Sequence, residues 1–140
     1  SEKQKYSYIR DHQGFFPQAS MTISGALDLV AATQITMSSP DGTLLSMKGI
    51  DGSTNVGNKT FKANGTDAQA ADGILQIVNT NLANKVTASL SSNQIVLTSE
   101  KPGPDGNVAK ITSVTSIPDS VTFNSVTANN SGSGFLFTGG

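Results

Sequence analysis

The 140-residue sequence contains no cysteine, no tryptophan and only one histidine, His12. Without cysteine, the chain can form neither a disulfide framework nor a thiolate metal site. With one histidine there is no two-histidine metal spacing, and a Ser-His-Asp triad would have to be built on the polar N-terminal segment. The lack of tryptophan removes the aromatic-rich cleft expected of an enzyme that binds sugars. These absences argue against the commonest catalytic arrangements.

Charge is scarce as well. Charged residues make up 14% of the chain, and nine Lys+Arg against ten Asp+Glu give a formal net charge of −1. A nucleic-acid-binding surface needs a basic excess that displaces counterions, so we expect no direct nucleic-acid binding. The acidic residues are scattered singly, mostly at turns and at a helix start, where carboxylates are favoured for structural reasons. We therefore expect no enzyme activity, no cofactor and no bound metal.

Long apolar runs are also missing. The longest fall far short of the ~20 residues that a membrane helix needs, so we expect no membrane partner. Residues 1–13 lack the apolar segment of a secretory signal. If the protein reaches the outside of a cell, another route takes it there, and assembly inside an infected cell followed by lysis would suffice.

The strongest local signals present lie between residues 64 and 107. Thr66 can cap a helix by accepting from the backbone N–H of Gln69, whose side chain completes a capping box. The sequence predicts a helix over 66–82, within which Gly73 costs roughly 1 kcal/mol relative to alanine and so indicates a close packing partner. Apolar residues recur at helical spacing along it: Ala71, Ile74, Leu75, Val78 and Leu82.

After this helix the apolar period changes to two. Val86, Ala88 and Leu90 alternate with polar residues, as do Ile95 and Leu97 beyond a tight connection at 91–94. This pattern predicts a β-hairpin with one buried face, which packs on the apolar stripe of the helix. Residues 101–107 follow as a long turn with two prolines and two glycines.

A capped helix is followed here by V-T-A-S, a short turn, I-V-L-T-S and a G-x-x-G-N loop. This succession resembles the small α/β insert of tail sheath and related tail proteins of contractile bacteriophages. It is also similar to the repeat of flagellar hook-associated proteins and flagellins. The resemblance covers about a third of the chain and implies a structural part of an extracellular or virion assembly, with no catalytic residues. The residues that carry it are Thr66, Asp67, Ala70, Ala71, Ile74, Ile77, Asn79, Val86, Thr87, Ala88, Ile95, Val96, Leu97, Thr98, Gly103, Gly106 and Asn107.

Short strands are predicted on both sides of this region. Residues 21–49 are expected to form a β-meander, with a strand at 27–32, although that stretch also fits a helix. Within the meander, Ile35 and Met37 should pair antiparallel with Leu45 and Met47 across a turn at 38–42. Further strands are expected at 60–63, 108–116 and 120–127.

The two ends are predicted to be assembly contacts. Residues 1–20 form an N-terminal arm, 21–128 a single β-rich domain, and 129–140 a flexible C-terminal tail. The N-terminal segment could instead be a frayed terminus, although its aromatic residues favour an arm that docks on a neighbouring subunit. The C-terminal apolar residues either close the chain's own sheet as a last strand or add a strand to a neighbour. The predicted contact residues are Tyr6, Tyr8, Phe15, Phe16, Phe135, Leu136 and Phe137.

Together these features predict an α+β, mostly β fold: an antiparallel sheet or sandwich with one amphipathic helix and extended arms at both ends. The expected function is that of a bacteriophage virion structural protein, a tail subunit (tube, sheath-associated or baseplate) that binds itself and other virion proteins. Its expected location is the virion, after assembly in the host cytoplasm. The alternatives are a capsid decoration or cement protein, a secreted adhesin or flagellar hook-associated module, and a carbohydrate-degrading enzyme, which would need clustered carboxylates.

Overall fold

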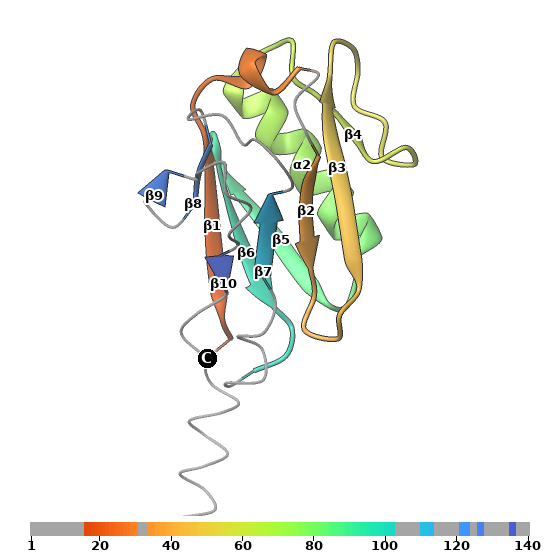
Figure 1. Ribbon diagram of the computed structural model, residues 1–140, viewed down its shortest axis with the longest axis vertical. Coiled ribbons are helices and arrows are strands. Elements are labelled where there is room, and N and C mark those ends of the chain that lie inside the picture. The colour runs from red at the N-terminus through yellow and green to blue at the C-terminus, as the bar shows by residue number, and fades with distance from the viewer. Residues whose placement is uncertain are drawn as a thin grey trace, which may run out of the picture.

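The chain folds into two small β-sheets, with an α-helix packed against both (Figure 1). This computed structural model describes residues 16–30 and 34–102, together with the strands at 110–113, 121–123, 126–127 and 135–136. In chain order the elements are β1 (Gln18–Ile23), the 3-10 helix η1 (Ala26–Leu29), β2 (Ile35–Ser38), β3 (Leu44–Ile50), β4 (Thr60–Lys62), α2 (Asp67–Asn81), β5 (Val86–Ser91), β6 (Gln94–Ser99), β7 (Lys110–Ser113), β8 (Val121–Phe123), β9 (Val126–Thr127) and β10 (Phe135–Leu136).

Each sheet has five strands. Sheet I has the order β5-β6-β1-β8-β9, and sheet II has the order β10-β7-β2-β3-β4. Among these strands, β3 and β4 pair in parallel and the other neighbours pair antiparallel. This architecture confirms the predicted α+β, mostly β fold class. Most of the predicted extended arms, residues 1–15 and 137–140 included, lies outside the described residues.

One hydrophobic core joins the two sheets and the helix. Alternate residues of the strands point inward, as the two-residue period predicts. Burying each such side chain contributes roughly 1.5–3 kcal/mol. The core residues of sheet I include Met21, Ile23, Ile95 and Leu97, and those of sheet II include Met37, Leu45 and Met47.

The helix α2 begins and ends as the sequence predicts. Thr66 Oγ1 accepts from the backbone N–H of Gln69 at 3.1 Å, and the Gln69 side chain accepts from the backbone N–H of Thr66 at 3.0 Å. The buried face is wider than the predicted stripe, because the helix touches β5 of sheet I and β4 of sheet II. Ile77 is therefore buried in addition, whereas Leu75 is only partly buried.

Gly73 lies directly against Phe61 of β4 and against Thr54. A Cβ atom at this position would stand 2.6 Å from Thr54 Oγ1 and 2.9 Å from Phe61 Cβ. Thr54 Oγ1 cannot easily move aside, because it accepts from the backbone N–H of Lys62 at 2.9 Å. The predicted close packing partner of this glycine is confirmed, and it is the strand that leads into the helix.

We expect Gly73→Ala to destabilise the fold, although alanine is the better helix former. The exchange would gain about 1 kcal/mol in an open helix, but overpacking against Thr54 and Phe61 costs roughly 1–3 kcal/mol. Urea denaturation should therefore give a lower free energy of unfolding. Gly52→Ala is the matched control, since its Cβ would lie 3.7 Å from the nearest atom, Ile50 Cδ1. A more stable Gly73→Ala variant would contradict the tight contact.

The hairpin of β5 and β6 is confirmed. Its register pairs Ala88 with Leu97 and Ser91 with Gln94, so the connection has two residues, the first of which, Ser92, has a φ of 57°. Val86, Ala88, Ile95 and Leu97 are buried as predicted. Leu90 is an exception, because its side chain is 38% exposed near the end of β5.

The predicted β-meander over 21–49 is wrong in its first half. The strand β1 pairs with β6 and β8 in sheet I, whereas β2 and β3 belong to sheet II. The second half is confirmed, since Ile35 pairs with Met47 and Met37 with Leu45.

The strand expected at 27–32 is also wrong, because residues 26–29 form η1 and 31–33 lie outside the described part of the chain. The Asp67 carboxylate accepts from the backbone N–H groups of Gly25 (3.1 Å) and Ala26 (2.8 Å) and so fixes the start of this turn. Its spacing buries Ala26 and Leu29 and leaves Leu27 exposed.

Two short segments of the predicted arm and tail lie in strands. Residues 18–20, expected in the N-terminal arm, belong to β1. Residues 135–136, expected in a flexible tail, form β10, whose backbone pairs with β7 of the same chain. The strands expected at 60–63, 108–116 and 120–127 are present but shorter, as β4, β7, β8 and β9.

Candidate functional site

Three of the seven predicted assembly residues fall on described positions. Phe16 is 43% exposed, just before β1, where Pro17 O accepts from the backbone N–H of Ser99 at 2.9 Å. The backbones of Phe135 and Leu136 pair with Ile111 and Lys110. This pairing matches the alternative in which the segment closes the chain's own sheet. Tyr6, Tyr8, Phe15 and Phe137, like His12, lie outside the described residues.

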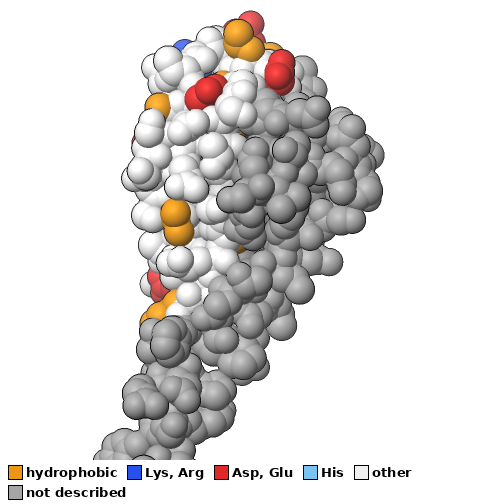
Figure 2. Space-filling view, turned by 90° about the vertical axis from the view of Figure 1, so that its left-hand side faces the viewer, with side chains coloured by type: hydrophobic (Ala, Val, Ile, Leu, Met, Phe, Trp, Pro, Cys, Tyr) orange, Lys and Arg blue, Asp and Glu red, His pale blue; other side chains and the backbone are white. Residues whose placement is uncertain are grey.

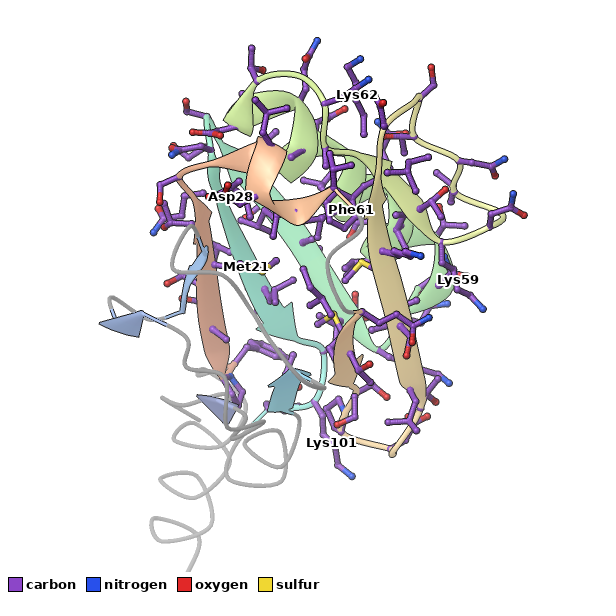
Figure 3. All side chains as sticks on the ribbon, turned by 45° about the horizontal axis from the view of Figure 1, so that its top comes forward. Met21, Asp28, Lys59, Phe61, Lys62 and Lys101 are labelled. Atoms are coloured by element: carbon purple, nitrogen blue, oxygen red, sulfur yellow. The ribbon has the colours of Figure 1, made fainter. Side chains whose placement is uncertain are left out.

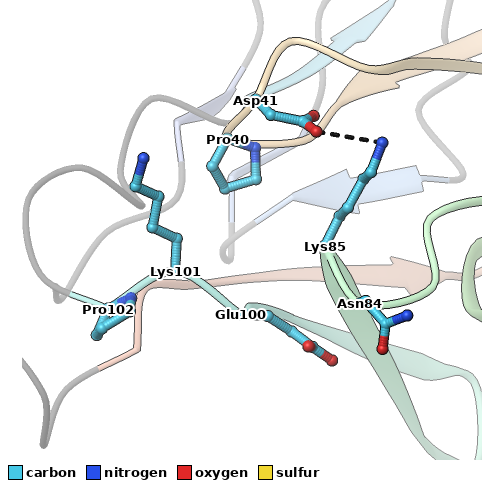
Figure 4. A pocket seen from close by; sticks show the side chains of 7 residues that line it. All are labelled: Pro40, Asp41, Asn84, Lys85, Glu100, Lys101 and Pro102. Carbon is cyan, nitrogen blue, oxygen red and sulfur yellow. Dashed lines mark ion pairs between the residues drawn. The ribbon is translucent and has the colours of Figure 1, made fainter.

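A pocket of about 240 Å³ lies where three turns meet (Figure 4). The turn between β2 and β3 contributes Pro40 and Asp41, and the connection from α2 to β5 contributes Asn84 and Lys85. The segment that follows β6 contributes the remaining lining residues. The lining residues are Pro40, Asp41, Asn84, Lys85, Glu100, Lys101 and Pro102.

Both carboxylates of this pocket have hydrogen-bond or ion-pair partners. The Asp41 carboxylate accepts from the Ser39 hydroxyl, from the Thr43 backbone N–H (3.0 Å) and hydroxyl (2.7 Å), and lies 3.1 Å from Lys85 Nζ. These donors, Ser39 first, hold the pKa of Asp41 well below its usual value. Glu100 accepts from the Thr87 hydroxyl at 2.5 Å. The arrangement therefore ties the turns together, and the lowered pKa makes Asp41 a weak base.

We expect Asp41→Asn to lower the melting temperature at neutral pH. Because the pKa of Asp41 is lower in the folded than in the unfolded chain, its ionised form stabilises the fold above the unfolded-state pKa of about 3.9. That contribution is lost as the pH falls toward the folded-state pKa. The difference between parent and variant in thermal melts should therefore shrink below about pH 4. Asp28→Asn, on an exposed turn without these hydrogen bonds, is the control, and a pH-independent difference for Asp41→Asn would contradict the explanation.

A second and larger hollow lies on the outer face of β3, and we call it the β3 groove. Its volume is about 490 Å³. In β3, Leu45, Met47 and Gly49 point into the core, so Leu44, Ser46 and Lys48 point outward. Leu44 is 71% exposed there. The lining residues are Gln34, Leu44, Ser46, Lys48, Asn58, Lys59 and Thr60.

The β3 groove is basic. Lys48 and Lys59 are both exposed, and neither forms an ion pair with any residue in the described ranges. Their backbones are joined, because the Lys48 N–H donates to Lys59 O at 3.1 Å, and Lys59 takes a left-handed conformation (φ 59°). The sequence prediction missed this groove. The one sequence signal for the groove was the pair Leu44-Leu45. Only one of two consecutive strand residues can face the core, so the other leucine must face outward.

Asn79 closes the outer edge of β5. Its side-chain amide donates to Ala88 O (3.0 Å) and accepts from Ala88 N–H (2.8 Å), so it pairs with the strand as a neighbouring strand would. An unpaired strand edge invites association with other chains. This asparagine, which the resemblance includes, thus satisfies both backbone groups of one edge residue and joins α2 to sheet I.

We expect Asn79→Ala to cost roughly 1–3 kcal/mol of folding free energy, because both backbone groups of Ala88 lose their partner. The variant should also aggregate more readily on heating, through the opened edge of β5. Chemical denaturation and light scattering would measure the two effects. Thr80→Ala, at the next exposed helix position, is the matched control. Equal stability of the two variants would show that the Asn79 amide contributes nothing to the edge.

The described residues also bear on metal binding and on membrane crossing. No group of three or more His, Cys, Asp or Glu side chains gathers there as a metal site would require. No helix in the same ranges is both long enough and apolar enough to cross a lipid bilayer.

Comparison with known proteins gives no relative. No protein-family model, no curated protein and no solved structure matches the chain.

Proposed function

We propose that this chain is a structural subunit of a bacteriophage particle, built into its tail, which associates with copies of itself and with other virion proteins. The observation that carries this proposal is the role of the residues behind the resemblance. Thr66 caps α2, Ala70, Ala71, Ile74 and Ile77 fill the core, and Asn79 closes a strand edge. They form a framework, which is what a subunit repeated in an assembly requires.

Sheet II supplies a second reason. At its β10 edge, a strand of only two residues pairs with β7. A strand this short adds few backbone contacts to the sheet. The same pairing made with a neighbouring copy would add a strand to that neighbour's sheet. Exchange of an identical element between copies is a low-cost route to association.

The surface chemistry also suits close packing of copies. On the face drawn in Figure 2, most described atoms belong to neither charged nor hydrophobic side chains, and the hydrophobic ones are scattered. With a formal net charge of −1, repeated copies repel one another weakly. A chain that stays apart from its copies usually carries more charge.

We expect the purified chain to form rings or polymers of regular shape, visible by electron microscopy and by sedimentation at rising concentration. Deleting residues 130–140 should prevent this assembly while changing the melting temperature little, because β10 adds few backbone contacts. Deletion of residues 139–140 alone is the matched control. A chain that stays monomeric at every concentration would contradict the proposal. Loss of folding in the longer deletion would assign the C-terminal segment to the chain's own core instead.

A further inference from the structure

The two most exposed large hydrophobic side chains in the described part of the chain stand in surroundings of opposite charge. Leu44 is 71% exposed and lies in the basic β3 groove. Leu27 is 67% exposed and lies in η1, beside the exposed Asp28. Figure 3 shows Asp28 at η1 and Lys59 beyond β3, so the two sites occupy separate parts of the surface.

The site at η1, which we call the acidic corner, consists of Leu27 and Asp28. The backbone of this turn is fixed, because Ala26 and Leu29 are buried and the Asp67 carboxylate accepts from the backbone N–H of Ala26. The Asp28 side chain has no hydrogen bond or ion pair with another described residue. The corner therefore presents an apolar side chain and a carboxylate that has no partner among the described residues, both on a fixed turn.

The β3 groove offers the complementary groups. Leu44 supplies an apolar surface, and Lys48 and Lys59 supply two ammonium groups that lack an acidic partner in the described ranges. Gln34 and Asn58 add polar side chains at its walls. A ligand that suits this groove carries an exposed apolar side chain next to a carboxylate. The acidic corner of the same chain has that combination.

We propose that the acidic corner of one copy docks in the β3 groove of a second copy, with Leu27 against Leu44 and Asp28 between Lys48 and Lys59. This contact rests on the proposed self-association and adds to it a second surface, distinct from the β10 edge of sheet II. Apolar contact supplies affinity, and the charges select the orientation, because like charges brought together at an interface oppose binding. Since the two partners use different surfaces, each copy can bind one neighbour on each side.

Charge exchange tests the contact. Across the proposed contact, Asp28→Lys brings a lysine against Lys48 and Lys59. The double variant Lys48→Glu with Lys59→Glu brings two glutamates against Asp28. Each variant alone should associate at least about tenfold more weakly than the parent chain in sedimentation velocity. A mixture of the two variants should recover association, because both possible contacts between unlike copies pair opposite charges. High salt should weaken association of the parent chain and of the mixture.

Matched controls carry the same charge changes elsewhere. Asp72→Lys lies on the exposed side of α2, and Lys62→Glu with Lys101→Glu lies outside the groove. These variants should associate as the parent does, and circular dichroism should show all of the variants folded.

The outcomes separate this contact from the proposed function. If the parent assembles and the exchange variants assemble equally well alone, or their mixture fails to recover association, the contact is overturned and the subunit role stands. A parent chain that is monomeric at every concentration overturns both. Recovery in the mixture, with unaffected controls, supports the contact.

Discussion

The position of α2 against the two sheets depends on two contacts that the rest of the fold needs. Gly73 lets the helix backbone approach β4 of sheet II, and Asn79 pairs with the edge of β5 in sheet I. The capping box at Thr66 fixes where the helix begins, and so places both residues opposite their partners. Because the core side chains of both sheets pack around this helix, a change in its position would disturb the whole core.

The start of the same helix also shapes the surface. Asp67, the first helical residue, binds the backbone N–H groups of Gly25 and Ala26, which lie about forty residues earlier in the chain. A carboxylate at a helix N-terminus is favoured by the helix dipole in any case. Here it holds η1 as well, so one side chain links the helix start to the turn that exposes Leu27 and Asp28.

The parts of the structure that could be predicted from sequence are those whose determinants lie close together in the chain. The capping box, the two hairpins and the close packing at Gly73 each follow from a few neighbouring residues. For the turn η1 the sequence left a strand and a helix open, because residues 26–29 fit an alternating strand and the deciding carboxylate is distant in sequence. The partner of β1 was missed for the same reason. The candidate sites were harder still, since the groove needs Leu44, Lys48 and Lys59 brought together by the pairing of β3 with β4.

The proposed contact limits the kinds of assembly that the chain can build. The contact is heterologous when each copy uses its corner and its groove on different neighbours, so two copies joined in this way leave one corner and one groove free. Association of this kind continues until the rotation between neighbours closes a ring, or continues without end as a helical polymer. A closed pair with two-fold symmetry would make the contact twice between the same two copies, the corner of each in the groove of the other, and would leave neither site free. The number of copies in the assembly therefore separates the arrangements, because a reciprocal pair stops at two copies whereas rings and helical stacks contain more.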